Sequence, residues 1–313
     1  TGVTQGAGAS AWVGRSHIRW LYRASRGPTA ASGRRAGFGG CRAQCLLLGS
    51  DMPLPRLQPF EFNDLDWVGA DLRDTVVESL SRGLDWGHTL TGLVDPFAEF
   101  LAEAGTDRVL DLCAGAGGPA QILVNEFRRA GREPPEILLT DLYPRERAWQ
   151  RLSRAEPKID SHPSAIDATA IPSDVGAGRA RAIINAFHHF PPSLARSILE
   201  DAVRARAPIW VSEAFGRNPL AFLPFAPFGL AALLANPLLT PEKTWGKAVL
   251  SWGMLPLTLG IGAWDGVVST LRVYEHADLL EMVAPHSASY RWRFGTYRYA
   301  LGGEGYFFCG API

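Results

Sequence analysis

Residues 108–120 read RVLDLCAGAGGPA, and this stretch decides the fold. A short apolar run carries Asp111 near its end, and Gly115 and Gly117 follow before Pro119. Glycine adopts positive φ angles without strain and has no Cβ atom to keep a ligand away from the backbone. Proline is favoured in the first turn of a helix. The stretch therefore predicts a strand, a tight glycine turn and a helix, with a ligand resting against the turn.

Short apolar strands alternate with amphipathic helices on both sides of this turn. The expected strands are 108–113, 136–141, 163–167, 181–186 and 208–212. The expected helices are 119–130 and 193–205, after an earlier helix with Asp95 as its N-cap and Gly105 as its stop. This alternation predicts parallel βαβ units and so a doubly wound α/β sheet. The C-terminal segment alternates aromatic residues with arginine and contains a Gly-Gly turn, which predicts an antiparallel hairpin.

Three aspartates end consecutive expected strands: Asp111, Asp141 and Asp167. In a doubly wound sheet the ligand lies beyond the carboxyl ends of the strands. A carboxylate just before the glycine turn would repel a dinucleotide pyrophosphate, but it would attract a ligand with an ammonium and a sulfonium group. S-adenosylmethionine carries both groups. Each aspartate alone also fits a structural role as a strand-end or N-cap residue, so the prediction depends on the three together.

At these residues the chain resembles the class I S-adenosylmethionine-dependent methyltransferases of the small-molecule type. The resemblance covers about 105–215, and its motifs are VLDLCAGAGG, TDLYP, DATAIP and INAFHHFPP. It implies a Rossmann-like, mostly parallel seven-stranded sheet in which the C-terminal hairpin inserts an antiparallel strand. One position departs from the family, because Cys113 stands where the first glycine is common.

The resemblance also implies which residues would contact S-adenosylmethionine. They are Asp111, Gly115 and Gly117 for the methionine end, Asp141 and Leu142 for the ribose, Asp167 and Ala168 for the adenine, and Asn185 for the methyl-donor centre. No metal is expected, since the sequence has no Cys/His cluster with the spacing of a zinc site.

The candidate catalytic residues follow the fourth and fifth expected strands. His188 and His189 lie in AFHHF, where a histidine could remove a proton from a hydroxyl acceptor. Glu213 ends the fifth strand and is a second polar candidate. Two alternatives stay open: the histidines only shape the pocket, or alignment of the reactants supplies most of the rate.

Residues 218–264 form an apolar insert. No charged residue lies between Arg217 and Glu242, or from Ala248 to Trp264. The insert fits a buried helical cap, or a lid or membrane-contacting hairpin that admits a lipophilic acceptor. Its prolines disfavour a membrane span. As a lid, it should turn aromatic side chains inward, with five candidates: Phe222, Phe225, Phe228, Trp245 and Trp252.

Composition sets the remaining expectations. Residues 1–51 are rich in Gly, Ala, Arg and Ser, and are interpreted as a disordered or non-native extension, with a targeting segment as the alternative. The working domain is then 52–313, with N-terminal helices over 52–105. The 52–313 portion has 24 basic and 30 acidic residues, which disfavours nucleic acid as a partner. The scattered cysteines favour a cytoplasmic location, with membrane association through 218–264 left open.

The sequence therefore predicts an enzyme that methylates a small, hydrophobic acceptor with S-adenosylmethionine. One alternative is an NAD(P)-dependent oxidoreductase, because GAGGPA also satisfies the dinucleotide fingerprint. Another is a non-catalytic binding module of the same fold. The acceptor atom and the oligomeric state are not assigned.

Overall fold

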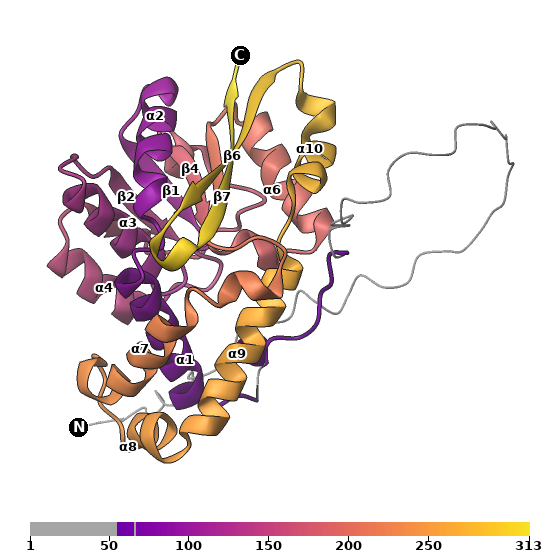
Figure 1. The fold of residues 1–313 in the computed structure, drawn as a ribbon. Helices are drawn as coiled ribbons and strands as arrows, with labels where there is room; N and C mark the ends of the chain where they lie inside the picture. The colour runs from indigo at the N-terminus through magenta and orange to yellow at the C-terminus, as the bar shows by residue number, and fades with distance from the viewer. Residues whose placement is uncertain (1–54, 66) are drawn as a thin grey trace, which may run out of the picture.

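The computed structural model describes residues 55–65 and 67–313, and the interpretation of residues 1–51 lies outside this range. Its centre is a seven-stranded sheet in the order β3-β2-β1-β4-β5-β7-β6 (Figure 1). The strands are β1 Arg108–Leu112, β2 Glu136–Thr140, β3 Ile159–Ser161, β4 Ala180–Ile184, β5 Ile209–Glu213, β6 Tyr290–Arg298 and β7 Glu304–Pro312. The first five are parallel, and β7 lies antiparallel between β5 and β6. The doubly wound sheet and the antiparallel hairpin are therefore confirmed.

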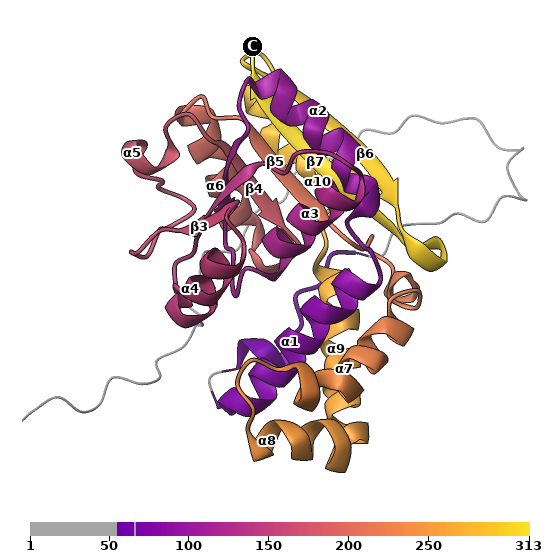
Figure 2. The same cartoon turned by 90° about the vertical axis from the view of Figure 1, so that its left-hand side faces the viewer.

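Helices cover both faces of the sheet (Figures 1 and 2). Around the sheet they are α2 Val94–Ala104, α3 Gly118–Arg129, α4 Glu146–Ala155, α5 Ser173–Gly176, α6 Pro192–Arg204 and α10 His276–Val283. On one face α2 and α3 bury Phe97 and Leu123 against the sheet, where Trp210 stacks on Phe307 with ring centroids 4.7 Å apart. On the other face α6 and α10 bury residues such as Ile198 against β4 and β5. Apolar burial on both faces explains why the strands read as continuous apolar runs.

Two local predictions were wrong. The helix expected to start at Asp95 begins at Val94 after Leu93, so Asp95 lies inside its first turn and is not the N-cap. The third strand is Ile159–Ser161 rather than 163–167. Its pairing with β2 ends at Ser161, and Pro163, which has no N–H to donate, follows soon after.

The apolar insert forms a helical end of the molecule beside α1 Ala70–Trp86, away from the sheet (Figures 1 and 2). Its elements are η4 Pro219–Phe222, α7 Ala226–Leu239, α8 Trp245–Ala248, the π-turn η5 Val249–Gly253, and α9 Leu255–Arg272. In the described part of the chain, no single helix is long and apolar enough to cross a membrane. The segments Trp245–Gly253 and Leu255–Arg272 pass that test together, but they meet at an angle of 87°.

A buried lysine fastens the insert to α1. Lys247 is 1% exposed, and its Nζ donates to Glu78 Oε1 at 2.8 Å and to Thr240 Oγ1 at 2.9 Å. A buried charge needs such partners, because removing it from water costs several kcal/mol. The position of the insert relative to α1 therefore depends on this cluster.

Replacing Lys247 with methionine should lower the free energy of unfolding by about 3 kcal/mol, because Glu78 keeps its charge and loses its partner. Lys243→Met is the matched control, since Lys243 is exposed on the loop just before α8. Chemical denaturation measures both variants. Equal losses in the two would show that the buried pair does not hold the insert in place.

Candidate active site

The glycine turn follows β1 and leads into α3. Gly115 and Gly117 have φ angles of 54° and 85°, which glycine adopts without strain. A Cβ atom on Gly117 would lie 2.6 Å from Leu152, whereas one on Gly115 would meet nothing within 4 Å. Gly117 is therefore required by close packing, and Gly115 leaves open space beside the turn. Cys113 also has a positive φ of 67°, which gives a physical reason for glycine at this position in the family that the chain resembles.

Asp111 lies within β1, and its side chain points into the protein rather than into water. It is 3% exposed, and its Oδ2 atom has no hydrogen-bond partner among the described residues. Burial, with a further contribution from the Asp141 carboxylate, raises the pKa of Asp111 well above its usual value. A buried acceptor without a donor is costly. The carboxylate is therefore suited to a cationic group placed beside the turn.

The structure brings Asp141 to the turn and holds it with backbone donors. Gly115 N donates to Asp141 Oδ2 and Tyr143 N donates to Asp141 Oδ1, both at 2.9 Å. Each carboxylate oxygen retains a lone pair that can accept from a ligand hydroxyl. Leu142 follows directly and is partly buried.

Asp167 reaches the same edge of the sheet by a different route from the expected one. It follows a loop rather than a strand, and Ile166 N donates to Asp141 O at 2.9 Å, which joins the two segments. Its Oδ1 accepts from Thr169 N and Thr169 Oγ1, as in a turn. Ala168, next in the chain, packs partly buried against the core. Asp141 and Asp167 therefore lie near each other beyond the carboxyl end of β2, although the strand predicted to lead to Asp167 was wrong.

Asn185 follows β4 with a φ of 55°. Its Oδ1 accepts from Ala214 N at 2.8 Å, while its Nδ2 is buried without a partner in the described residues. Because positive φ is uncommon outside glycine, this conformation is held by the surrounding contacts. The free amide donor lines the cavity described below.

His188 and Glu213 form a buried pair. His188 Nδ1 lies 2.8 Å from Glu213 Oε2, and His188 N donates to Glu213 Oε1 at 2.9 Å. When Nδ1 donates to Glu213, the neutral ring carries its lone pair on Nε2. The Nε2 atom is buried and has no hydrogen-bond partner among the described residues. Burial alone would lower the pKa of His188, but the charge and hydrogen bond of Glu213 outweigh it, so the pKa lies above its usual value.

The His189 ring lies beside that of His188, tilted by 35° with ring centroids 4.2 Å apart, but its surroundings differ. Its Nδ1 lies 3.4 Å from Arg272 Nη1. Burial in the pocket, followed by the neighbouring His188, lowers the pKa of His189. His189 is therefore disfavoured as a proton acceptor at Nδ1.

Residues 55–64 form an N-terminal strap that contacts the segment of His188 and His189. The sequence analysis did not predict this part of the site. Glu61 is 3% exposed, and its Oε1 lies 3.0 Å from Arg272 Nη1. The same guanidinium lies 2.9 Å from Asp64 Oδ2. Arg56 Nη2 donates to His188 O at 3.1 Å. No motif marks Glu61, and the only available signal was an acidic, aromatic segment before the first helix.

Asp265 binds this strap from α9. Its carboxylate accepts from Phe62 N at 2.7 Å and from Asn63 N at 3.1 Å. Burial raises its pKa to about 6, even though these two hydrogen bonds oppose the shift. The strap and the insert are therefore joined at the rim of the pocket.

Glu61, His188 and His189 could offer ligand atoms to a metal ion, since one atom from each lies within 4.8 Å of the others. Arg272 argues against a divalent cation there, because its guanidinium already neutralises Glu61 and would repel the ion. The cluster fits a polar pocket wall better than a metal centre.

A cavity of about 360 Å³ lies between the strand ends and the helical end. Asn185, His188 and Glu213 lie at its polar end, and α1, α7 and α9 supply apolar walls. Phe222 and Phe225 line it as expected.

The other three aromatic candidates of the insert do not line this cavity. Phe228 packs on Gly87, because a Cβ atom added to Gly87 would lie 3.1 Å from the Phe228 ring. Trp245 and Trp252 point outward and are 88% and 53% exposed, so the prediction for them was wrong. A helix apolar on all sides gives no periodic signal of which face is inner.

No protein-family model matches the chain, and no curated protein matches its sequence. Solved structures do resemble it. Magnesium protoporphyrin IX methyltransferase from Synechocystis PCC 6803, with bound SAH, is 12% identical over 72% of this chain and 84% of that one, with a TM-score of 0.40. NcsB1, an O-methyltransferase from neocarzinostatin biosynthesis, is 14% identical over 77% and 58%, with a TM-score of 0.44. A protein described as a putative Zn-dependent alcohol dehydrogenase from Rhodobacter sphaeroides is 13% identical over 74% and 98%, with a TM-score of 0.40.

None of these structures assigns an activity to this chain at such identities, so the strand order carries the conclusion on the fold. Five parallel strands are followed by β7, which is inserted antiparallel between β5 and β6, as the sequence resemblance implied. The chain has a Rossmann-like, mostly parallel seven-stranded sheet with an antiparallel C-terminal pair.

Proposed function

We propose that the protein transfers a methyl group from S-adenosylmethionine to the hydroxyl of a small, hydrophobic acceptor. One observation carries the proposal: His188, whose Nε2 has no partner among the described residues, lines an apolar cavity together with Asn185, the candidate residue for the methyl-donor centre. Gly117 of the glycine turn lines a separate pocket, so Asn185 is the residue that links the cavity to the proposed cofactor site.

The residues at the glycine turn fit S-adenosylmethionine. Asp111 offers a buried, unpartnered carboxylate oxygen to the ammonium group, and Gly115 leaves its surroundings open. Asp141 and Asp167 each retain acceptor capacity toward the ribose and the adenine. When bound, the cofactor supplies an electrophilic methyl group on a sulfonium.

The chain itself would align the acceptor and move one proton. The apolar walls hold the acceptor and exclude water, which favours its alignment with the methyl group. His188 Nε2 would take the hydroxyl proton while the acceptor oxygen displaces sulfur from the methyl carbon, so that S-adenosylhomocysteine would be the leaving group. Glu213 fixes the ring through Nδ1 and stabilises the imidazolium that results. Glu213 is then a positioning residue, since both its oxygens are occupied by His188.

Methyl transfer is tested by supplying S-adenosylmethionine with a labelled methyl group and a panel of lipophilic phenols. We expect label in the organic extract for the wild type, and a decrease of about 10²- to 10⁴-fold in His188→Ala. His286→Ala is the control, because His286 is half-buried and does not line the cavity. No labelled product from any hydroxyl acceptor would count against this assignment of the reaction.

Cofactor binding is tested separately with S-adenosylhomocysteine and NAD in thermal melts. Asp111→Asn should weaken S-adenosylhomocysteine binding roughly tenfold or more, because the charged contact is lost. The ligand-free melting temperature should not fall, since the amide keeps the volume of the side chain and brings no charge into the interior. Asp107→Asn, exposed at the other end of the strand, is the control. Stabilisation by NAD alone would favour the oxidoreductase instead.

The His188–Glu213 pair makes a prediction about pH. Because Glu213 keeps the pKa of His188 above its usual value, activity should fall as the pH decreases through that raised pKa. Glu213→Gln removes the charge and leaves burial to act, so the pKa of His188 should fall. The NMR titration of the His188 ring measures both values. An unchanged pKa in the variant would show that Glu213 does not tune this histidine.

A further inference from the structure

The helical end of the molecule exposes an unusually apolar surface. We call it the insert face, and it consists of side chains of 220–264 that are at least 37% exposed. They are Leu220, Leu223, Leu230, Leu234, Leu238, Leu239, Trp245, Val249, Trp252, Met254, Leu257, Leu259 and Trp264. Isolated exposed apolar residues are normal on soluble proteins, but so many at one end of the molecule mark an interaction site.

On α7 the outward and inward faces are both defined. Leu230, Leu234 and Leu238 recur every four residues and are 37%, 40% and 64% exposed. The opposite face is buried through Leu233 and Asn236, and Asn236 Oδ1 accepts from Arg82 Nη1 at 2.9 Å. The helix is thus fixed on α1 with a stripe of leucines directed away from the protein. A surface helix normally turns polar residues outward, so this arrangement needs an apolar environment.

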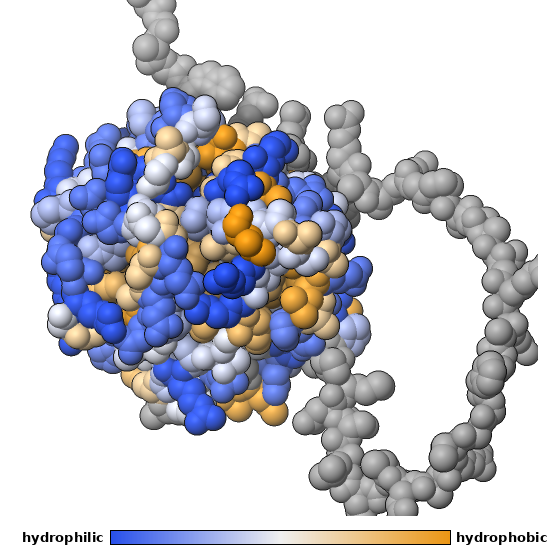
Figure 3. Space-filling view, turned by 90° about the horizontal axis from the view of Figure 1, so that it is seen from above, coloured by the Kyte–Doolittle hydropathy of each residue, from blue (hydrophilic) through white to orange (hydrophobic). Residues whose placement is uncertain are grey.

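The apolar side chains of the insert face come from two stretches without charge. No Asp, Glu, Lys or Arg occurs between Arg217 and Glu242, or from Ala248 to Trp264, and the exposed charges Glu242 and Lys243 lie on the loop between these stretches. By contrast, hydrophilic residues cover most of the opposite end of the molecule, seen in Figure 3. A surface without charged or paired polar groups has little to set the register of a specific protein partner. It does match the acyl region of a lipid layer, and exposed tryptophans are typical of the boundary of that region.

The cavity opens onto this face. Leu223, Leu230 and Leu259 line the cavity, yet they are 62%, 37% and 41% exposed. The entrance is therefore built from side chains that also form the insert face. A hydrophobic acceptor could pass from an apolar phase to His188 along a continuous apolar surface.

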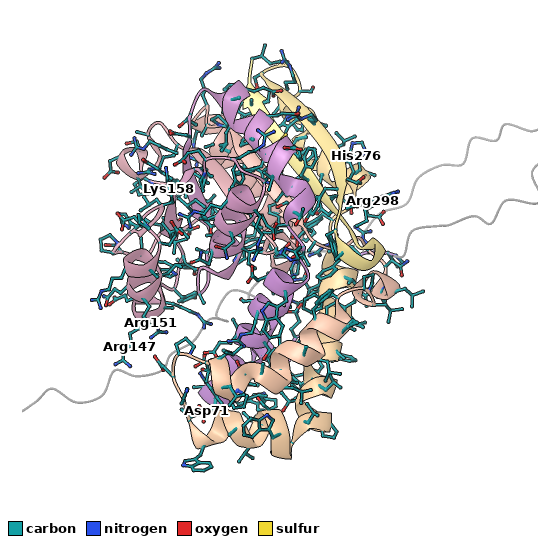
Figure 4. The ribbon with its side chains drawn as sticks, turned by 60° about the vertical axis from the view of Figure 1, so that its left-hand side comes forward. Asp71, Arg147, Arg151, Lys158, His276 and Arg298 are labelled. Atoms are coloured by element: carbon teal, nitrogen blue, oxygen red, sulfur yellow. The ribbon has the colours of Figure 1, made fainter. Side chains whose placement is uncertain are left out.

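Basic residues lie beside the insert. Arg147 and Arg151 are exposed on α4, and in Figure 4 they project toward the end of the molecule that holds Asp71. Arg151 Nη1 lies 3.0 Å from Glu242 Oε1, which places α4 next to the loop between α7 and α8. Arg151 is paired with Glu242, whereas Arg147 has no ion pair among the described residues, so Arg147 is the charge at the margin of the apolar face that favours anionic headgroups.

We propose that the insert face docks onto an anionic lipid surface and that the acceptor is a membrane-resident, lipophilic hydroxyl compound drawn into the cavity from that surface. The second half of this inference rests on the proposed methyl transfer. The docking itself depends only on the insert face and its neighbouring arginines.

The test is sedimentation of the full chain with vesicles of phosphatidylcholine, alone or mixed equally with phosphatidylglycerol. We expect the wild type to bind the mixed vesicles more tightly. Leu234→Glu/Leu238→Glu should lower the bound fraction roughly tenfold or more, because two apolar contacts are replaced by charge. Leu280→Glu, 44% exposed on α10, is the matched control and should bind normally. Trp245→Gln serves as a second variant at a position 88% exposed, where folding is not at risk.

The outcomes separate docking from catalysis. Arg147→Gln/Arg151→Gln should weaken binding to the anionic vesicles and leave binding to phosphatidylcholine unchanged. Failure of the wild type to bind vesicles, or equal binding by the Leu234/Leu238 variant and its control, would overturn docking even if S-adenosylhomocysteine still binds. Self-association of the wild type that this variant abolishes, without vesicle binding, would assign the face to a second copy of the chain. Vesicle binding without any S-adenosylhomocysteine binding would leave docking standing and refute the methyl transfer.

Discussion

The buried carboxylate of Glu213 is the interaction on which the site depends. It is 2% exposed at the end of β5, so it must find donors within the protein. Both donors come from His188, through the backbone N at 2.9 Å and the ring Nδ1 at 2.8 Å. The short helix η3 Phe187–His189 is thereby held against β5, and His188 lines the cavity. The Glu213 carboxylate thus fixes the backbone at His188, the orientation of its ring and the tautomer with the proton on Nδ1.

A second polar cluster supports the same segment from the other side. Arg272, 2% exposed near the end of α9, lies 3.0 Å from Glu61 and 2.9 Å from Asp64. Arg56 adds a hydrogen bond to the carbonyl of His188. Buried charges of this kind contribute little net stability, but removing one partner is costly, so they specify an arrangement. The strap, the insert and the histidines therefore form one polar assembly beneath an apolar cavity.

The sequence predicted the parts of the fold that are local in the chain. The glycine turn, the apolar strands and the closing hairpin have short-range patterns, and the structure has them. The third strand was misplaced because a short edge strand has almost no pattern, yet Asp167 still reaches Asp141 through the bond from Ile166 N to the Asp141 carbonyl. Glu61 was missed because its role depends on Arg272, more than two hundred residues away in the chain.

The two faces of α7 explain why its sequence has no helical period. An amphipathic pattern arises when one side of a helix meets the core and the other meets water. In α7, Leu233 lines the cavity, while Leu234 and Leu238 point outward and are equally apolar. If the outer side contacts lipid, both sides have the same requirement and the period disappears. On the proposed docking, the absence of a helical period in α7 and the apolar entrance to the cavity have the same explanation. Both suit a lipophilic acceptor that moves from the lipid to His188 without crossing water.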